Sequence, residues 1–408
     1  MSSAFKVAPL SPHPELARLR QQIDEVDRDL ISLLEKRASM VFLVGDYKRE
    51  NQLPVHDPVR EKKIKSRIRD LVSQQSSLSI NEMESLFMLM VEKFRFLESA
   101  HSNKQSVLEN VMLKTSIDFS RSQQVVIWGF GLLGASFYLA LNESLPHWSY
   151  RIVDPYIEVD SFLKWKSENK LTNIELMNSD QMKNADLYIL AGPVDVNAKH
   201  LREFNFPNKS LVFDLGSTKK TMSEIYETRQ QHSTTDFTYV GGHPLAGRES
   251  SGFTNADPLL FYNKTFCWVT SNLQHLNSPL KMTFDSLAFY LGANPFWIEA
   301  AEHDEALAWT SHLPQILSSA LANCLTEKKF SANGEVFPGV ISQLLRISGS
   351  SLSIWQSIVE TNQKQLQAAL TELIQQLNET QTNLKSVEGC KKIFNQSNYF
   401  YRKFKKGV

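Results

Sequence analysis

The chain has 408 residues, a length that exceeds one ordinary hydrophobic core and predicts two or three domains. Hydrophobic residues make up 42% and charged residues 22%, proportions that are typical of globular proteins and not of disordered chains. Lys plus Arg and Asp plus Glu both total 44, so the basic excess that nucleic-acid binding requires is missing, and any anion site must depend on a few well-placed cations.

The three cysteines, Cys267, Cys324 and Cys390, lie far apart and include no C-x-x-C pair. This spacing is typical neither of a disulfide framework nor of a zinc site, and we expect no bound metal. The start of the chain carries one Lys and no long apolar run, and no segment approaches the roughly 20 apolar residues that span a bilayer. We therefore expect a cytoplasmic protein with no nucleic-acid or membrane partner.

A long helix is predicted from Pro14 to Glu50, with a proline in its first turn and Pro54 beyond its end. Its apolar residues recur every three or four positions on one stripe, at Leu16, Leu19, Ile23, Val26, Leu30, Leu33, Met40, Val44 and Tyr47. At about 1.5 Å per residue the helix would be roughly 55 Å long. A domain of this size cannot cover that length alone, so we expect a homodimer with interlocked helices.

The sequence predicts two further helices before residue 100. The second follows Pro58, and its apolar positions are Val59, Ile64, Ile68 and Leu71. Ser79 and Glu82 have the spacing of a capping box, which predicts the start of the third helix. The apolar positions of this third helix are Met83, Leu86, Met90, Phe94 and Leu97. The first domain is therefore expected to be all-α.

Several cations lie on or beside the apolar stripe of the first helix. Arg37 falls within the stripe, where an unpaired charge is costly, and Lys48 follows eleven positions later on nearly the same face, so both can converge on one anion. Arg20 lies on another azimuth and is better placed to reach into the site of a partner chain. Arg60 and Glu61 open the second helix. A simpler interpretation stays open, namely a coiled coil with solvated charges and one Arg–Glu pair.

Four segments of this region resemble the all-helical chorismate mutase family, in the order and spacing of that family. The segments are Arg20–Asp24, Leu33–Arg37, Val44–Lys48 and Pro54–Glu61. The resemblance implies that Arg37 and Arg60, with Arg20 of the partner subunit, hold the two carboxylates of chorismate, and that Lys48 donates to the ether oxygen. Such a pericyclic rearrangement needs no nucleophile. It needs the reactive conformer to be held and the charge on the ether oxygen to be stabilised.

The same resemblance implies that Asp57 and Glu61 orient the ring hydroxyl of the substrate. It also places Glu98 at the ether oxygen, a position that is Gln in some members of the family. A carboxylate at this position must be protonated to donate a hydrogen bond. Phe94 is a second departure, because it stands where well-known members have a serine, and it removes a polar contact near a substrate carboxylate.

Residues 101–122 are polar and are expected to link the first domain to a second, in which strands and helices alternate. The predicted strand Val125–Trp128 leads into a glycine-rich turn that opens a helix. This turn consists of Gly129, Phe130, Gly131, Leu132, Leu133 and Gly134. The next predicted strand, Tyr150–Val153, ends at Asp154, and this combination is the fingerprint of a dinucleotide site. Asp154 would accept from both ribose hydroxyls and repel a 2′-phosphate, so we expect NAD as cofactor; a strand–turn–helix without ligand is the simpler alternative.

Later strands also end in loops that carry polar residues. These strands are Ala185–Ala191, Leu211–Leu215 and Tyr239–Gly241. Ligands of a doubly wound sheet lie at the carboxyl ends of its strands, which makes Ser217 and His243 candidate site residues, His243 in a glycine-rich loop. A short strand, Pro295–Ile298, is expected to extend the sheet. From about Ala300 the chain is expected to be helical, with apolar residues that indicate a second dimer interface.

Motifs of the second half resemble prephenate and arogenate dehydrogenases. They are Asp214–Lys219, Gly242–Gly247, Glu302–Asp304, Ser311–Pro314, and Arg346 with Trp355 nine residues later. With the first domain, they resemble bifunctional chorismate mutase–prephenate dehydrogenases. The resemblance implies oxidative decarboxylation of prephenate, in which His243 takes the proton of the ring hydroxyl as hydride passes to NAD. It also implies that Arg346 holds a substrate carboxylate and that Ser217 orients His243 or the nicotinamide.

His303, Asp304 and His312 are implied by the same resemblance to line the substrate pocket. Two departures concern carboxylate recognition. Gln315 stands where related sequences often have a histidine, and Arg248 stands where a small polar residue often follows the histidine motif. Both affect the expected choice between prephenate and arogenate.

The predicted fold class is multidomain: an all-α chorismate mutase domain (1–100), a linker (101–122), an α/β Rossmann domain (123–299) and an all-α C-terminal substrate and dimerisation domain (300–408). Three alternatives are arogenate dehydrogenase with a weak or regulatory mutase domain, a β-hydroxyacid dehydrogenase, and an NAD-sensing dimer without turnover. The histidine motif argues against the second, since such enzymes use a catalytic Lys on a helix. Arg37 on the apolar stripe argues against the third.

Overall fold

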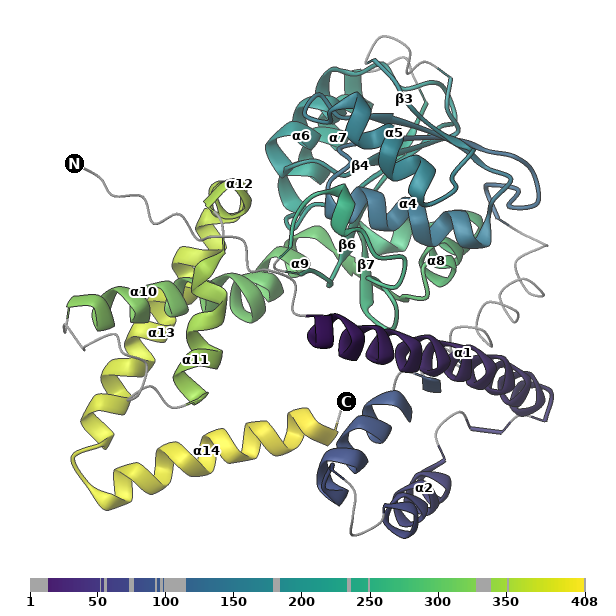
Figure 1. The fold of residues 1–408 in the computed structure, drawn as a ribbon. Coiled ribbons are helices and arrows are strands. Elements are labelled where there is room, and N and C mark those ends of the chain that lie inside the picture. The colour runs from purple at the N-terminus through teal and green to yellow at the C-terminus, as the bar shows by residue number, and fades with distance from the viewer. Residues whose placement is uncertain are drawn as a thin grey trace, which may run out of the picture. The chain divides into compact units, whose positions relative to one another are not determined.

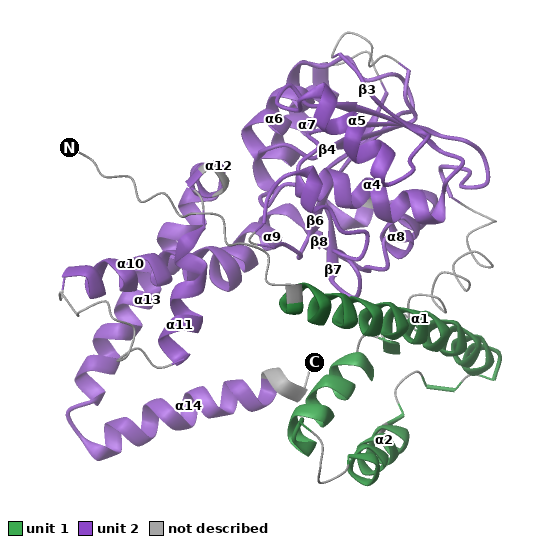
Figure 2. Ribbon diagram, in the orientation of Figure 1, with its two compact units in different colours: residues 1–111 green, residues 112–408 purple. Residues whose placement is uncertain are grey.

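The computed structural model describes residues 14–51, 53–54, 57–72, 77–91, 94–95, 98, 115–178, 184–232, 236–248, 250–327, 339–350 and 352–406. The chain divides into two compact units, residues 1–111 and residues 112–408, and each is described by itself (Figure 2). Residues 101–114 of the expected linker lie outside the described part of the chain.

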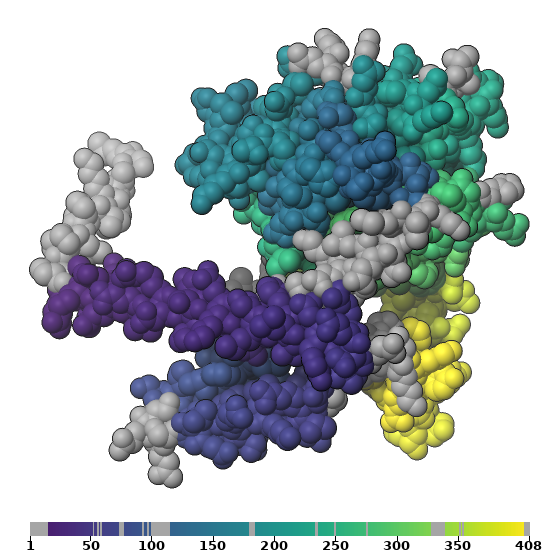
Figure 3. Space-filling view, turned by 90° about the vertical axis from the view of Figure 1, so that its right-hand side faces the viewer, coloured from purple at the N-terminus to yellow at the C-terminus, as the bar shows by residue number. Residues whose placement is uncertain are grey.

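Unit 1 begins with α1, which spans Pro14–Glu50 as its apolar stripe predicts. Figure 3 shows this helix as an extended purple rod. Its apolar stripe is largely exposed in the single chain, with 46% of Leu19, 64% of Val26 and 62% of Tyr47 accessible to solvent. An exposed apolar stripe of this length is typical of a surface that another chain covers. The interlocked homodimer stays a prediction.

The remaining helices of unit 1 begin at well-defined caps. Helix α2 spans Pro58–Leu71, and its N-cap is Asp57, whose Oδ1 accepts from the backbone N–H of Arg60 at 2.9 Å. A third helix covers residues 80–91, and residues 94, 95 and 98 are also helical. The predicted capping box is confirmed: the Glu82 carboxylate accepts from the Ser79 N–H at 2.8 Å, and the Ser79 hydroxyl accepts from the Glu82 N–H at 3.3 Å. The described part of unit 1 is all-α, as expected.

The described part of unit 2 is built on one sheet of eight strands in the order β3-β2-β1-β4-β5-β6-β7-β8 (Figure 1). The strands are β1 (Gln124–Trp128), β2 (Ser149–Val153), β3 (Ile174–Leu176), β4 (Leu187–Leu190), β5 (Leu211–Asp214), β6 (Thr238–Pro244), β7 (Thr265–Thr270) and β8 (Asn294–Glu299). Neighbouring strands are parallel except β6 and β7. The order of the first six strands is that of a dinucleotide-binding fold, which confirms the predicted Rossmann domain.

Helices cover both faces of this sheet. They are α4 (Leu132–Ser144), α5 (Val159–Glu168), α6 (Val194–Glu203), α7 (Lys220–His232) and α8 (Ser278–Tyr290). Helices α6 and α7 bury Leu201 and Met222 against one face. Helices α4 and α8 cover the other face, where Phe137 and Phe284 both pack on the ring of Phe213. The parallel strands therefore end at one edge between these two layers.

Strand β6, which carries His243, is longer than the sequence predicts. The sequence predicts a strand that ends at Gly241 and a loop that carries His243, but β6 runs to Pro244. The reason is β7, a strand that the sequence did not predict: its antiparallel pairing places His243 opposite Cys267 and so extends β6 beyond its parallel neighbour β5. The loop assignment of His243 is wrong, and the histidine is held by a strand. Strand β8 extends the sheet as predicted.

The described residues from Ala300 onward are mainly helical, as expected. Their elements are α9 (Ala300–Leu307), a π-helical turn (Ala308–His312), α10 (Leu313–Glu327), α11 (Gly339–Leu345), a 3₁₀ turn (Arg346–Gly349), α12 (Leu352–Thr361), α13 (Gln363–Asn383) and α14 (Val387–Lys406). Residues 115–122 pack with this unit, since the ring of Phe119 stacks on Trp148 at 5.6 Å. None of the helices described above combines the length and the apolar character that crossing a bilayer requires.

Candidate active sites

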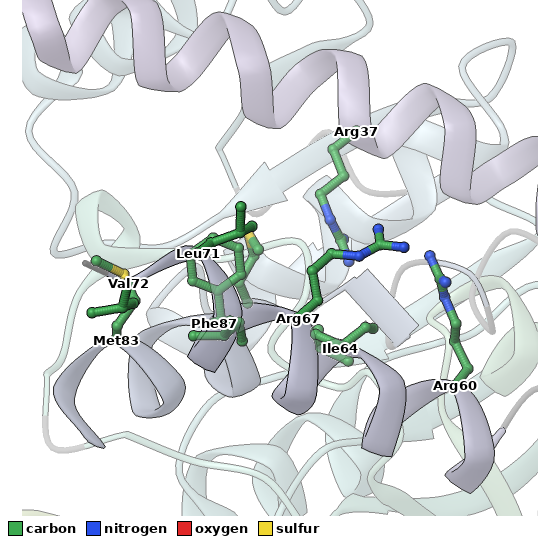
Figure 4. Close-up of a pocket in the computed structure, with 11 residues that line it drawn as sticks. Arg37, Arg60, Ile64, Arg67, Leu71, Val72, Met83 and Phe87 are labelled. Carbon is green, nitrogen blue, oxygen red and sulfur yellow. The ribbon is translucent and has the colours of Figure 1, made fainter. Parts of the chain in front are cut away.

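A cavity of unit 1 has three arginines at its wall. Arg37 projects from α1, and Arg60 and Arg67 project from α2; Figure 4 shows the guanidinium of Arg67 between the other two. The cavity measures about 500 Å³, and its other lining residues are apolar: Ile64, Ile68, Leu71, Val72, Met83, Phe87, Met90 and Val91. None of these described lining residues is acidic. Converging cations without a carboxylate are typical of a site for an anionic ligand with an apolar body.

Arg37 is the best-defined of these arginines. Its guanidinium carbon lies 4.2 Å from the centroid of the Phe94 ring, a cation–π contact. Its Nη1 is buried and has no hydrogen-bond partner among the described residues. Burial and the nearby Arg60 both lower the pKa of Arg37. A buried donor without a partner is costly, so the arginine is poised for an anion that would remove this cost.

A second cavity, of about 290 Å³, adjoins the first and shares Arg37 and Arg60 with it. Its further polar lining residues are Lys48, Asp57, Glu61, Arg95 and Glu98. Lys48 Nζ donates to Glu98 Oε1 at 2.8 Å, and Glu98 is only 7% exposed. The structure therefore brings together Lys48 and Glu98, the two residues to which the resemblance assigns the ether oxygen.

The two acids expected at the ring hydroxyl are partly engaged within the protein. Asp57 caps α2, a role that the Asp–Pro pair at the start of a helix could have predicted. Glu61 accepts from Arg95 Nη1 at 2.7 Å. The Asp57 carboxylate accepts its cap bond through Oδ1, and its second oxygen can also accept. Arg20 is exposed on α1 and lines neither cavity. It precedes Arg37 by seventeen helical positions, or about 25 Å, so its expected role requires a second chain.

The glycine-rich turn of unit 2 follows β1, as predicted. Gly129 has φ +87°, and a Cβ there would lie 2.7 Å from the backbone nitrogen of Gly192, so the fold itself requires this glycine. Gly131 is different: it is the N-cap of α4, and a Cβ there would meet nothing within 4 Å. The open space at Gly131, in front of the N–H groups of Leu132 and Leu133 that begin α4, fits a diphosphate. A side chain would occupy that space.

Asp154 follows β2 and lies beside this turn. Its Oδ2 accepts from the backbone N–H of Phe130 at 2.8 Å, and its Oδ1 accepts from the N–H of Tyr156 at 3.0 Å. Each oxygen can accept a further bond, so the carboxylate fits ribose hydroxyls next to the diphosphate position. Phe130 itself is buried and packs against Trp165, so its backbone and not its ring faces the turn.

His243 lies at the same carboxyl edge, in a chain of three buried side chains. Its Nδ1 is 3.0 Å from Nε2 of His303, and Nδ1 of His303 is 2.8 Å from Oδ1 of Asp304. The exposed fractions are 9% for His243, 0% for His303 and 1% for Asp304. Among the described residues, His303 is the one hydrogen-bond partner of the His243 side chain, and Ser217 is not. The structure thus brings together His243, His303 and Asp304, which the sequence could only place on separate motifs.

A buried ion pair supports this edge of the sheet. Lys219 and Asp214 are both 0% exposed, and Lys219 Nζ donates to Asp214 Oδ2 at 2.5 Å. Asp214 Oδ1 accepts from the hydroxyl of Tyr239 at 2.7 Å. Burial lowers the pKa of Lys219, and Asp214 opposes that shift. The sequence includes both charges in one motif but gives no sign that they pair, since buried charges are inferred only from tertiary contacts.

His312 lies at the end of the π-helical turn and is 1% exposed. Asn362 Nδ2 lies 2.7 Å from the backbone oxygen of Asp304 and 3.1 Å from Nδ1 of His312, so this amide joins the two. Burial lowers the pKa of His312 to about 4, which keeps the ring neutral. The ring also packs edge-on against Trp355. Asn362 is a site residue that the sequence did not reveal, because it belongs to no motif.

Arg346 and Arg248 complete the expected residues. Arg346 begins the 3₁₀ turn after α11 and is exposed, and its role as a carboxylate ligand stays a prediction. Arg248, which stands where related sequences often have a small polar residue, forms an ion pair with Asp257.

Comparisons with known families agree with this division. Residues 19–99 match the family described as chorismate mutase type II. Residues 165–278 match the nucleotide-binding domain of prephenate dehydrogenase, and residues 299–402 match its dimerization domain. The glycine-rich turn, Gly129–Gly134, lies before the residues that match the nucleotide-binding domain.

Individual relatives support both halves. The chorismate mutase of Methanocaldococcus jannaschii is 31% identical over 87 residues, which cover 21% of this chain and 87% of that protein. The prephenate dehydrogenase of Lactococcus lactis is 29% identical over 245 residues, 59% of this chain and 65% of that protein. The T-protein of Haemophilus influenzae is 24% identical over 236 residues, 57% of this chain and 53% of that protein. The matches thus span about half to two thirds of the dehydrogenase relatives.

A solved structure shows the same fold as unit 2. Prephenate dehydrogenase from A. aeolicus, in complex with hydroxyphenyl propionate and NAD⁺, superposes with a TM-score of 0.60 at 20% identity, over 70% of this chain and 98% of that one. With these matches in sequence order along one polypeptide, the chain belongs to the type II chorismate mutases through its N-terminal unit and carries both domains of the prephenate dehydrogenase family in its C-terminal unit.

Proposed function

We propose that the chain is a bifunctional enzyme of tyrosine biosynthesis, which rearranges chorismate to prephenate in unit 1 and oxidatively decarboxylates prephenate to 4-hydroxyphenylpyruvate in unit 2. One observation carries the proposal. The same chain has a cavity with three arginines and no acid among its described lining residues, and a buried histidine at the carboxyl edge of a dinucleotide-binding sheet. The two family assignments support one reaction each.

In the first reaction the chain supplies charge and shape. Arg37, Arg60 and Arg67 hold the two carboxylates of chorismate through charge-assisted hydrogen bonds. The apolar wall holds the ring in the reactive conformer. Lys48, which is fixed by Glu98, donates to the ether oxygen, where negative charge develops as the bond breaks. No proton is transferred, which agrees with a cavity whose polar groups are mostly permanent charges.

In the second reaction, the glycine-rich turn and Asp154 hold NAD, which accepts the hydride from the substrate ring when it is bound. His243 takes the proton of the ring hydroxyl at Nε2, the nitrogen that does not face His303. The substrate loses CO₂ as its ring becomes aromatic. Arg346 holds a substrate carboxylate, and Ser217, which follows β5 at the same edge, orients the nicotinamide.

The protein acts as a homodimer in this proposal. Three observations support it: the exposed apolar stripe of α1, the match to a dimerization domain, and the distance of Arg20 from Arg37 along one helix. Arg20 of the partner subunit then closes the carboxylate site. We also propose domain limits at residues 1–100, 123–299 and 300–408, with residues 115–122 of the expected linker packed on the second of these domains.

A coupled assay tests the proposal. Chorismate is supplied to the full-length protein without NAD and then with NAD, and the products are separated by chromatography. We expect prephenate alone in the first reaction, and 4-hydroxyphenylpyruvate with an equal amount of NADH in the second. Prephenate and arogenate are then offered separately with NAD. Oxidation of arogenate alone would replace the proposed substrate, and NAD binding without turnover would replace the proposed enzyme by a sensor.

A further inference from the structure

The chain of His243, His303 and Asp304 determines where the protons lie. Asp304 accepts from the backbone N–H groups of Lys219 at 2.8 Å and Lys220 at 2.9 Å, in addition to its contact with His303. A carboxylate with this set of donors acts only as an acceptor. The proton of His303 is therefore on Nδ1, which faces Asp304, and its Nε2 carries a lone pair.

The same reasoning extends to His243. Because Nε2 of His303 is an acceptor, the 3.0 Å contact requires the proton of His243 to be on Nδ1. The second nitrogen of His243, Nε2, then carries the free lone pair. This is the form that a general base needs, and an isolated histidine would adopt it only part of the time.

We propose that His303 and Asp304 are positioning residues that hold His243 in its Nδ1–H tautomer and stabilise the imidazolium that forms when Nε2 takes the proton of the substrate. This inference rests on the proposed dehydrogenase activity. No proton passes along the chain. The substrate proton stays on Nε2 of His243, Nδ1 keeps its own proton, and Asp304 contributes negative charge through the oriented ring of His303.

The surroundings of His243 explain why such support is needed. Burial, His303, Lys219 and His312 all lower the pKa of His243. Cys267, opposite His243 on β7, is neutral, because burial raises the pKa of its thiol to about 11. Two carboxylates lie near these groups. Asp214 is paired with Lys219, and Asp304 is in direct contact with His303. His243 is therefore neutral near pH 7. The positive charge that it gains in the reaction is disfavoured by burial and by the neighbouring basic groups, and Asp304, acting through the oriented ring of His303, supplies the compensating negative charge.

Asp304→Asn is the sharpest test. The oxygen of Asp304 that contacts His303, Oδ1, also accepts from the backbone N–H of Lys219. When the NH₂ group of the new amide takes the place of Oδ1, it gives up the bond from Lys219 and donates to Nδ1 of His303. The protons of both histidines then move to the other nitrogen, and Nε2 of His243 is protonated. A wrong tautomer of this kind typically costs about 10²–10⁴-fold in kcat. We expect this loss in prephenate oxidation, with little change in KM for prephenate or NAD and with unchanged mutase activity.

Two variants of His303 separate positioning from stability. His303→Gln keeps an oxygen that can accept from His243, whereas His303→Leu keeps the volume without an acceptor. Neither touches the N–H groups that Asp304 binds at the start of α7. We expect kcat to fall in the order wild type, His303→Gln, His303→Leu, and the acidic limb of the pH–rate profile to move in both. The matched control is His200→Gln, which removes a half-buried histidine that stacks on Trp128 and, among the described residues, makes no hydrogen bond or ring contact with His243, His303 or Asp304.

The tautomer itself can be observed by ¹⁵N NMR of the full-length protein labelled at histidine. We expect the His243 resonance, assigned with His243→Asn, to report an unprotonated Nε2 in the wild type and a protonated Nε2 in Asp304→Asn. The inference is overturned if Asp304→Asn and both His303 variants keep the wild-type kcat and pH profile, or if wild-type His243 carries its proton on Nε2. Absence of prephenate oxidation in the wild type would instead overturn the proposed function, which the assay shows before any variant is made.

Discussion

The guanidinium of Arg37 lies 4.2 Å above the ring of Phe94. In the sequence, Arg37 is a cation on an apolar stripe, and Phe94 is a departure from the family pattern that removes a polar contact. The structure gives Phe94 a positive role, because the ring supports a charge that has no acidic partner among the described residues and holds it at the cavity wall. The substitution of a small polar residue by Phe at this position therefore exchanges a contact to substrate for a contact to the arginine that binds it.

The two reactions should separate when Arg37 is removed. Arg37→Ala should lower mutase kcat/KM by at least about 10²-fold, since a charge-assisted, partly buried pair is lost, and should leave prephenate oxidation within about two-fold. Arg67→Ala should weaken the mutase less, mainly through KM, because Arg67 is more exposed. Arg28→Ala, on the same helix and outside both cavities, is the control. Equal loss of both activities in a folded Arg37→Ala protein would show that the sites are not independent.

Two glycines of the turn should respond differently to the same added methyl group. Gly131→Ala should fold normally, because its Cβ meets no protein atom within 4 Å, but should raise KM for NAD several-fold by occupying the space of the diphosphate. Gly129→Ala should lower the melting temperature of unit 2, because φ is +87° and the new Cβ meets Gly192. Thermal unfolding and NAD titration of the two variants provide the measurement. Normal NAD affinity in Gly131→Ala would place the diphosphate elsewhere.

Cofactor choice should depend on Asp154. The wild type should prefer NAD to NADP, since the carboxylate repels a 2′-phosphate, and Asp154→Asn should narrow that preference by raising KM for NAD. The bond from the Phe130 N–H can be kept by the amide oxygen of Asn, so the turn should stay intact. Ratios of kcat/KM for the two cofactors decide the matter. A wild-type preference for NADP would remove Asp154 from the cofactor site.

His243 and Arg346 should differ in which kinetic constant they control. His243→Asn should lower kcat of prephenate oxidation by about 10²–10⁴-fold with substrate still bound, as expected for loss of a general base. Arg346→Ala should raise KM more than it lowers kcat, since a carboxylate contact exists before the chemical step. NAD affinity should change little in either. If His243→Asn kept a near-normal kcat, the base would have to be sought among His303, Asp304 and His312.

Unit 2 should lose stability in mild acid. The folded-state pKa of His312 is about 4, below the ordinary value of 6.5, so between these values the unfolded chain binds more protons than the folded one. The free energy of unfolding therefore decreases as pH falls through this window, by on the order of 1 kcal/mol per pH unit for a single such group. The pKa of His243 is also lowered in the folded protein, so His243 too decreases the free energy of unfolding as the pH falls. Denaturant titrations of wild type and His312→Gln from pH 7 to 4 test this; the variant should show a shallower slope, and an identical slope would contradict the assignment.

Local features of the fold could be predicted from the sequence. The limits of α1, the capping box of Ser79 and Glu82, and the strand–turn–helix around Gly129 each depend on residues that are close in the chain. The length of β6 could not be predicted, because it depends on pairing with β7. The sequence of β7 lacks the alternation of apolar and polar residues by which a strand is recognised.

The sequence predicts which residues belong to the sites, but it does not predict which of them are in contact. His243 and His303 are 60 residues apart, and no periodicity states that their rings lie 3.0 Å from each other. Arg67 was missed for a related reason: a cation on a charged helix is usually a surface residue, and only the position of α2 shows that it faces a cavity. Asp57 was assigned to substrate alone, although its place before Pro58 also indicates an N-cap.

The π-helical turn at Ala308–His312 has a consequence for how this region diverges during evolution. A π turn holds one residue more than an α turn, and each residue of a helix rotates its successors by about 100°. Deletion of a single codon here would restore α geometry and rotate the side chains of α10 by about 100° relative to those of α9, which carries His303 and Asp304. Two homologues that differ by that one deletion could match at every other residue yet present different side chains of α10 to the site. Gln315 and the residue that follows the turn at the same sequence offset in such a homologue would therefore not face the same space.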